Sequence, residues 1–250
     1  MFSDIWTVMW KERKEWFSER ETVRGALAIF LGPLIMMAAV GILAPWRLGK
    51  AWVETPVSLA MALFVSLMFG GTTAGSIAGE RERHTLETLL ASRLSDQGIL
   101  YGKLASAVAF AWASATGAIL LGLATVNVAH WGSGLLVYRP TVIVADLLLS
   151  PLAATLSAAM GVFVSLKAAT VREAEQNIMA LLVGGSMVLI WGPILLLRTI
   201  PGLETRFSEL LTSLDVTQVV LVLLLVLIAL DVGFVVAAMH RFRRARLIVV

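Results

Sequence analysis

Six long apolar stretches, separated by short polar pieces, are the feature that most restricts what this chain can fold into. None of the stretches contains Lys or Arg, and only Asp146 and Asp231 carry a charge inside them. A bilayer core about 30 Å thick is crossed by roughly 20 apolar residues in a helix. The pattern therefore predicts an all-α polytopic membrane protein with six transmembrane helices. The six stretches are residues 25–44, 57–79, 104–129, 141–166, 178–197 and 216–239.

The composition and the short connections support this fold class. Apolar residues make up 58% of the chain and charged residues 15%, whereas soluble domains have about 45–50% and about 25%. The pieces between the stretches are too short to build a hydrophobic core of their own. We therefore exclude a soluble enzyme, a DNA-binding domain and a disordered scaffold. The expected organisation is an amino-terminal segment, residues 1–24, followed by one transmembrane domain, residues 25–250.

The distribution of Lys and Arg predicts the orientation. Of the 20 basic residues, 15 lie in alternate polar pieces that include both ends of the chain. Such an excess is typical of the cytoplasmic side, so we expect a multi-pass protein of the plasma (cytoplasmic) membrane with both termini in the cytoplasm. The first stretch begins behind a charged segment and is interpreted as an uncleaved anchor. The basic net charge indicates anionic lipid headgroups rather than nucleic acid as a partner.

Residues 1–24 have the pattern of an amphipathic helix. Its apolar positions include Phe2, Trp6 and Trp10, and its polar positions include Lys11 and Glu12. Tryptophan suits the headgroup region, where its ring is apolar and its N–H stays hydrated. Two interpretations remain open: an interfacial anchor alone, or an anchor that also contacts a cytoplasmic partner.

Residues 80–103 predict a short amphipathic helix between the second and third stretches. Its apolar stripe is Leu86, Leu89, Leu90 and Leu94. Ser95 and Asp96 are suited to begin the next helix. This short helix would either lie flat on lipid or dock into another protein.

Four further patterns concern structure. Thr170 and Glu173 fit a capping box at the start of a helix. Gly71, Gly75 and Gly79 lie four residues apart, which favours close helix packing. Residues 198–215 predict a short amphipathic helix on the outer side. Four aromatic residues near the outer ends of stretches are expected to form an interfacial belt: Trp46, Trp52, Trp131 and Tyr138.

The chain lacks the motifs of several chemistries. It has no GxxxxGK[ST] phosphate loop, and the string Gly98–Lys103 is one residue too short and follows no strand. Its three histidines are scattered and it has no cysteine, so we expect no metal site. Asp146 lies near an outer end and is interpreted as structural. Asp231 lies deeper, where it would either bond a neighbouring helix or contact a transported molecule.

Four groups of residues in the segment 80–103 resemble the signature of ABC-2-type (type V) transporter permeases. They are Glu80-Arg81-Glu82, Thr85-Leu86-Glu87, Leu89-Leu90 and Gly102-Lys103. The family usually has glycine before the threonine, where this chain has His84, which leaves the conformation of that turn open. The outline of the whole chain, with an amphipathic amino-terminal helix and six stretches, is also similar to the family.

The resemblance implies a half-transporter that works with other chains: a second permease chain, identical or different, and separate ABC ATPase subunits that hold ATP and Mg²⁺. This chain would bind no cofactor itself. Residues 80–94 would form the coupling helix of an exporter, with Arg172 and Glu173 as a secondary cytoplasmic contact. The alternatives are a non-transporting membrane subunit that docks an ATPase, and an intramembrane enzyme. The expected ATPase contacts are Glu80, Arg81, Glu82, Thr85, Leu86, Glu87, Leu89, Leu90 and Lys103.

Overall fold

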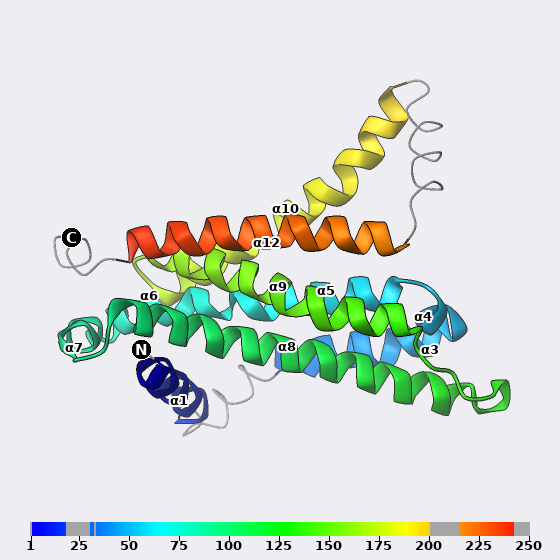
Figure 1. The fold of residues 1–250 in the computed structure, drawn as a ribbon, viewed down its shortest axis with the longest axis horizontal. Coiled ribbons are helices and arrows are strands. Elements are labelled where there is room, and N and C mark those ends of the chain that lie inside the picture. The colour runs from blue at the N-terminus through cyan, green and yellow to red at the C-terminus, as the bar shows by residue number, and fades with distance from the viewer. Residues whose placement is uncertain (1, 19–30, 33, 201–215, 243–250) are drawn as a thin grey trace.

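The computed structural model describes residues 2–18, 31–32, 34–200 and 216–242. Within these ranges the chain is helical and has no strand. Most of the helices run along the long axis of one bundle, whereas α1 lies across it (Figure 1). The predicted outer helix at 198–215 falls almost entirely outside the described residues, as does the start of the first apolar stretch.

The elements follow one another in chain order with short connections. They are α1 (Phe2–Ser18), the π-helix η2 (Ala39–Leu43), α3 (Ala44–Leu48), α4 (Lys50–Glu54), α5 (Val57–Gly70), the 3₁₀ turn η3 (Gly71–Thr73), α6 (Ala74–Glu82), α7 (Leu86–Ala91), α8 (Asp96–Ala129), the 3₁₀ turn η4 (Trp131–Ser133), α9 (Pro140–Ser165), α10 (Val171–Thr199) and α12 (Val216–Arg241).

Four helices in the described part of the chain are long and apolar enough to cross a membrane. They are Val57–Glu82, Asp96–Ala129, Pro140–Ser165 and Thr217–Arg241. They cover the second, third, fourth and sixth predicted stretches, so the helical class is confirmed, and the length and apolar character of these helices support a membrane-embedded protein. The described part of the first stretch is a shorter apolar helix, Leu34–Leu48. The fifth stretch lies within α10, and the count of six spans stays a prediction.

Helix α9 lies in the middle of the bundle because small side chains allow its neighbours to approach closely. It packs against α5, α6, α8, α10 and α12. The tightest approach is at Gly70 of α5, where a Cβ atom would lie 2.5 Å from the carbonyl oxygen of Ala154. One turn further on, the Thr73 hydroxyl donates to the carbonyl oxygen of Ala158 at 2.8 Å.

Two of the predicted belt residues are instead part of the core. Trp52 is fully buried and Tyr138 is 6% exposed. The Trp52 Nε1–H donates to the Tyr138 hydroxyl at 2.7 Å, and this hydroxyl donates to the Ile119 carbonyl oxygen at 3.0 Å. Gly49, with φ of 54°, turns the chain so that α4 folds back and inserts Trp52. Trp46 and Trp131 remain exposed, as a belt requires.

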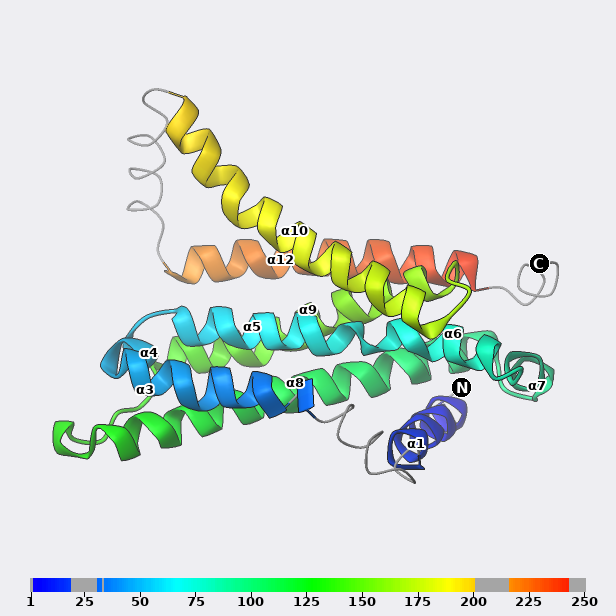
Figure 2. The same cartoon turned by 180° about the vertical axis from the view of Figure 1, so that it is seen from behind.

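The glycine row predicted for packing borders α10. A Cβ atom at Gly71 would lie 3.2 Å from Leu182, and one at Gly75 or Gly79 would lie 3.3 or 3.4 Å from Val171. Helix α10 contacts the bundle through this first part and then diverges from α12 toward its own carboxyl end (Figure 2).

Candidate functional site

A cluster of four charged side chains lies where α1, α6 and α8 meet. We call Lys11, Glu12, Glu80 and Lys103 the charge cluster. The Lys103 ammonium is 2.5 Å from Glu12 Oε1 and 3.7 Å from Glu80 Oε1, and Lys11 also pairs with Glu80. The Lys103 side chain is only 2% exposed. The two positive and two negative charges balance, so the cluster is neutral as a whole.

Additional hydrogen bonds complete the charge cluster. The Thr85 hydroxyl donates to Glu80 Oε2, and Lys103 donates to the Ser76 carbonyl oxygen at 3.4 Å. Buried ions are tolerated when they are paired and their remaining lone pairs and protons are satisfied. The charge cluster therefore joins three helices that are distant in sequence and holds them in one relative position.

Helix α1 reaches the charge cluster because two glycines of α8 let it approach. A Cβ atom at Gly98 would lie 2.6 Å from Cβ of Asp4, and one at Gly102 would lie 2.5 Å from Cβ of Val8. The string Gly98–Lys103 is thus part of a helix that contacts another helix. Its geometry is unlike that of a phosphate-binding loop, which precedes a helix.

The start of α8 is also bonded to α1. Ser95 is the N-cap residue, as predicted, and accepts a hydrogen bond from the Gly98 N–H at 3.1 Å. The Ser95 hydroxyl in turn donates to Asp4 Oδ2 at 2.9 Å. The side-chain and backbone hydrogen bonds from Ser95 hold the pKa of the Asp4 carboxyl below its ordinary value. This contact places the first turn of α1 beside the first turn of α8.

The conformation of the turn between α6 and α7, which the sequence left open, is decided by the structure. His84 has a φ of 56° and is the one residue other than glycine with a positive φ in the described ranges. This left-handed conformation is the one that glycine adopts most easily. In this chain His84 adopts it at the turn that precedes Thr85.

The predicted coupling helix is α7, and two of its leucines, Leu86 and Leu89, point into the bundle. Leu86 and Leu89 are 8% and 9% exposed and pack in a core cluster with Val8, Ile99 and Leu100. The Glu87 side chain between them is exposed. Helix α7 lies at the extreme end of the bundle (Figures 1 and 2). Leu86 and Leu89 therefore anchor α7, and the polar side of α7 remains accessible.

Arg81 and Glu82 connect α6 to the turn between α9 and α10. Arg81 donates to the carbonyl oxygens of Ala168 at 2.6 Å and Leu166 at 3.2 Å. Glu82 Oε2 accepts from the N–H of Val171 at 3.1 Å. These two side chains satisfy groups that the helix ends leave unpaired.

The start of α10 has the cap that its sequence predicts. The Glu173 N–H donates to the Thr170 hydroxyl at 3.2 Å, and Glu173 Oε2 accepts from the Ala169 N–H at 2.8 Å. Glu173 therefore has a local structural role, and Arg172 beside it is exposed.

The structure thus divides the predicted contact residues into two groups. Glu80, Thr85 and Lys103 belong to the charge cluster or its hydrogen bonds, whereas Glu87 faces outward. The side chain of Leu90 lies outside what the structure describes. Sequence reasoning missed the role of Lys11 and Glu12, and it set aside the glycines at 98 and 102. Their spacing of four residues, the usual mark of a close helix contact, was the available signal.

Asp231 is separate from this site. It lies in α12, is 6% exposed, and neither carboxylate oxygen has a hydrogen-bond partner in the described part of the chain. Asp146 of α9 is also buried but accepts a hydrogen bond from Ser150. The two acids do not form a bonded pair, and no group of three or more metal-binding side chains occurs in the described ranges.

Replacing Asp231 with leucine is expected to stabilise the protein. A buried polar group without a partner costs about 1 kcal/mol or more, and leucine has a similar shape without that cost. The variant should melt at a higher temperature in detergent micelles, as measured by tryptophan fluorescence. Asp231→Asn, which keeps a polar group, serves as the control and should not give the same increase. A lower melting temperature for Asp231→Leu would indicate that the carboxylate has a partner in the folded protein.

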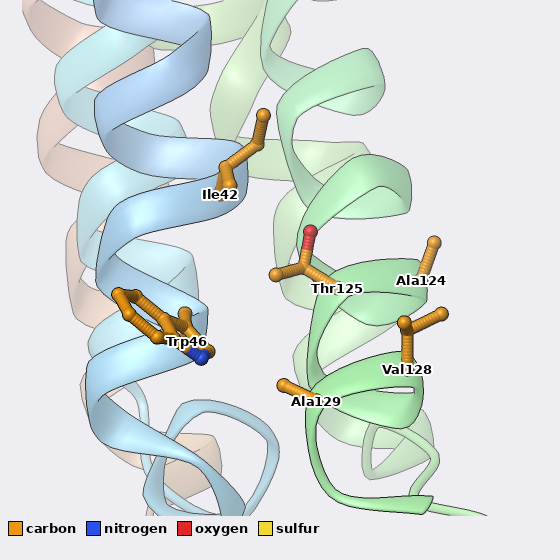
Figure 3. A pocket seen from close by; sticks show the side chains of 6 residues that line it. All are labelled: Ile42, Trp46, Ala124, Thr125, Val128 and Ala129. Atoms are coloured by element: carbon orange, nitrogen blue, oxygen red, sulfur yellow. The ribbon is translucent and has the colours of Figure 1, made fainter.

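An apolar groove lies at the other end of the bundle, between η2–α3 and the last turns of α8 (Figure 3). It is lined by Ile42, Trp46, Ala124, Thr125, Val128 and Ala129. The Thr125 hydroxyl donates to the carbonyl oxygens of Gly41 and Leu121, both at 2.9 Å. The lining therefore offers no acid, base or nucleophile for catalysis.

The chain matches no protein-family model, and no curated protein matches it.

Proposed function

We propose that this chain is the membrane-spanning permease subunit of an ABC-2-type transporter, acting as an exporter. In this proposal it crosses the plasma membrane six times, with both termini in the cytoplasm, and works with a second permease chain. A separate ATPase subunit binds ATP and Mg²⁺ and hydrolyses the nucleotide. The motif at residues 80–103 is the origin of the proposal, and the arrangement around α7 is the observation that supports it best.

The supporting arrangement is a short helix that is anchored rather than loosely attached. Helix α7 is fixed by Leu86 and Leu89, and the helix before it is connected to α1 and α8 through Glu80. Arg81 connects the same helix to the turn before α10. A displacement applied to α7 would therefore be transmitted to several membrane helices together. Such coupling requires that the partner bind the two states of the bundle with different free energies.

The exposed side of α7 is where the proposed ATPase subunit would bind. Glu87 and Thr88 are exposed on α7, and Arg93 is exposed in the connection that follows it. In the charge cluster Glu12, Glu80 and Lys103 are buried and Lys11 is partly exposed, and these residues would act indirectly by holding α7 in place. Among the predicted contact residues, Glu87 would therefore touch the ATPase subunit, and several others would hold α7 in position.

The test is a charge reversal at Glu87. The variant Glu87→Lys is co-expressed with a candidate ABC ATPase subunit, purified, and reconstituted into vesicles to measure ATP turnover and transport. A like-charge contact at an interface costs several kcal/mol, so binding of the ATPase subunit and stimulated turnover should fall about ten-fold or more. The melting temperature should not change, because Glu87 is exposed.

The matched control is Glu54→Lys, the same charge change at an exposed position of α4 at the opposite end of the bundle. It should leave binding and turnover unchanged. Unchanged binding in Glu87→Lys would show that α7 is not the contact. If the ATPase subunit binds and no transport of any candidate cargo is found, the chain is a docking subunit without transport activity.

A further inference from the structure

Asp231 occupies a position of α12 where a membrane helix ordinarily has an apolar residue. The side of α12 that packs on the core clusters is formed by Leu224, Leu227, Phe234 and Ala238. Asp231 is four residues after Leu227 and seven before Ala238, so it lies on the same side of the helix. It is 6% exposed. The carboxylate is therefore directed into the bundle rather than toward lipid.

The Asp231 carboxylate also lies near the middle of the membrane. It belongs to the candidate span Thr217–Arg241. At a rise of about 1.5 Å per residue it is about 15 Å from the Arg241 end, and half of a bilayer core is also about 15 Å. An acid at this depth is costly and commonly marks the path of an ion or a substrate.

The fold satisfies Asp146, the other buried acid of the predicted stretches, but not Asp231. Asp146 accepts a hydrogen bond from Ser150, four residues further along α9. The equivalent positions around Asp231 are Leu227 and Val235, whose side chains cannot donate. Both carboxylate oxygens of Asp231 are buried and have no hydrogen-bond partner among the described residues. A ligand that carries hydrogen-bond donors and a positive charge would satisfy them.

A groove between α8 and α12 ends about one turn from Asp231. It has a volume of about 370 Å³ and lies at the end of the bundle that carries α7. Val235 lines it and is four residues after Asp231, so the two side chains lie on neighbouring turns of one side of α12. An apolar lining with a few polar groups suits a molecule that has an apolar body and a charged group. The groove is lined by Val235, Val236 and Met239, with polar groups from Asp96, Gln97 and Tyr101.

We propose that Asp231 binds the positively charged group of an organic monocation, which reaches it through the groove between α8 and α12. This names the class of cargo and rests on the proposed function for transport, whereas the binding step needs this chain alone. An ammonium group supplies the N–H donors and the single positive charge that the carboxylate lacks, and the apolar body would lie against Val236 and Met239. Because Asp231 is 6% exposed, α12 must shift relative to α8 to admit the cation, and the cation would favour the shifted state.

The binding test measures the melting temperature of the full chain in neutral maltoside micelles during a titration with hexylammonium chloride. At 100 times its Kd a ligand should raise the melting temperature of the parent protein by about 5 °C or more. Asp231→Asn and Asp231→Leu should show no such increase, and the expected higher stability of Asp231→Leu separates loss of binding from a folding defect. Asp231→Glu should keep part of the increase. Asp146→Asn, the matched change at the other buried acid, should keep all of it.

Two further probes define the class of ligand. Hexanol has the same apolar body without the charge, and sodium chloride supplies a cation without the body. Neither should raise the melting temperature of the parent protein. The proposal is overturned if hexylammonium gives no increase in the parent, or an equal increase in Asp231→Asn. An equal increase with sodium would also overturn it, since the ligand would then be a metal ion.

The route is tested with Val236→Trp, which narrows the groove at a position that is 52% exposed and so tolerates a larger side chain. The affinity for hexylammonium should fall about ten-fold. Val232→Trp is the matched control, because Val232 is 59% exposed on the same helix and lies outside the lining of the groove. Equal affinities in the two variants would overturn the route. All these measurements use this chain without an ATPase subunit, so their failure is distinct from unchanged ATPase binding in Glu87→Lys.

Discussion

Replacing Lys103 with methionine is expected to destabilise the protein by about 3–5 kcal/mol, because it breaks a buried ion pair by removing one partner. Methionine fills a similar volume but leaves the Glu12 carboxylate without the ammonium group that lies 2.5 Å away. The charge cluster would then carry a net negative charge in a buried position. The measurement is the midpoint of thermal or denaturant unfolding in detergent micelles.

A second variant separates charge imbalance from loss of packing. The double variant Lys103→Met with Glu12→Leu removes one positive and one negative charge together and leaves the pair of Lys11 and Glu80 intact. It should recover much of the lost stability, because apolar replacement of a complete buried pair is often neutral. Lys50→Met, at an exposed position, should have little effect. If Lys103→Met alone also has little effect, the charge cluster does not hold the three helices.

Replacing Gly70 with alanine is expected to lower the free energy of unfolding by about 3 kcal/mol, near the upper end of overpacking effects. The new Cβ atom would lie 2.5 Å from the carbonyl oxygen of Ala154 and 3.0 Å from Cβ of Ser157. The first of these is a backbone atom of α9, so the contact cannot be relieved by rotating a side chain. The expected result is a clear fall in the melting temperature.

The matched control is Gly184→Ala in α10, where a Cβ atom would meet nothing within 4 Å. Alanine favours a helix over glycine by about 1 kcal/mol, so this variant should be neutral or slightly stabilised. If both alanine variants behave alike, α5 and α9 are not as close as the structure places them.

The local patterns of the sequence predicted the helices and their starts well. The apolar stretches at 57–79 and 141–166 correspond closely to Val57–Glu82 and Pro140–Ser165. Ser95 and Thr170 cap α8 and α10 as their sequence contexts indicated. These features depend on residues within one turn or one helix, so each can be inferred from its own segment.

The partners of individual side chains were much harder to predict. Trp52 and Tyr138 have the residue type and the sequence position of belt residues, yet they form a hydrogen bond with each other in the core. Glu80 and Lys103 were expected at a surface contact, yet both are buried against α1. In each case the decisive neighbour comes from a helix far away in the sequence, and no local pattern identifies it.

The sequence by itself determined that the chain forms apolar helices, where several of them begin, and that it lacks a phosphate loop. Hydrophobicity, capping and motif spacing depend only on neighbouring residues. The tertiary structure alone decided which side of α1 meets the bundle, that Lys11 and Glu12 share a charge cluster with Glu80 and Lys103, and that the Asp231 carboxylate has no hydrogen-bond partner among the described residues. These outcomes depend on the approach of distant helices, which close packing at Gly70 and Gly102 permits.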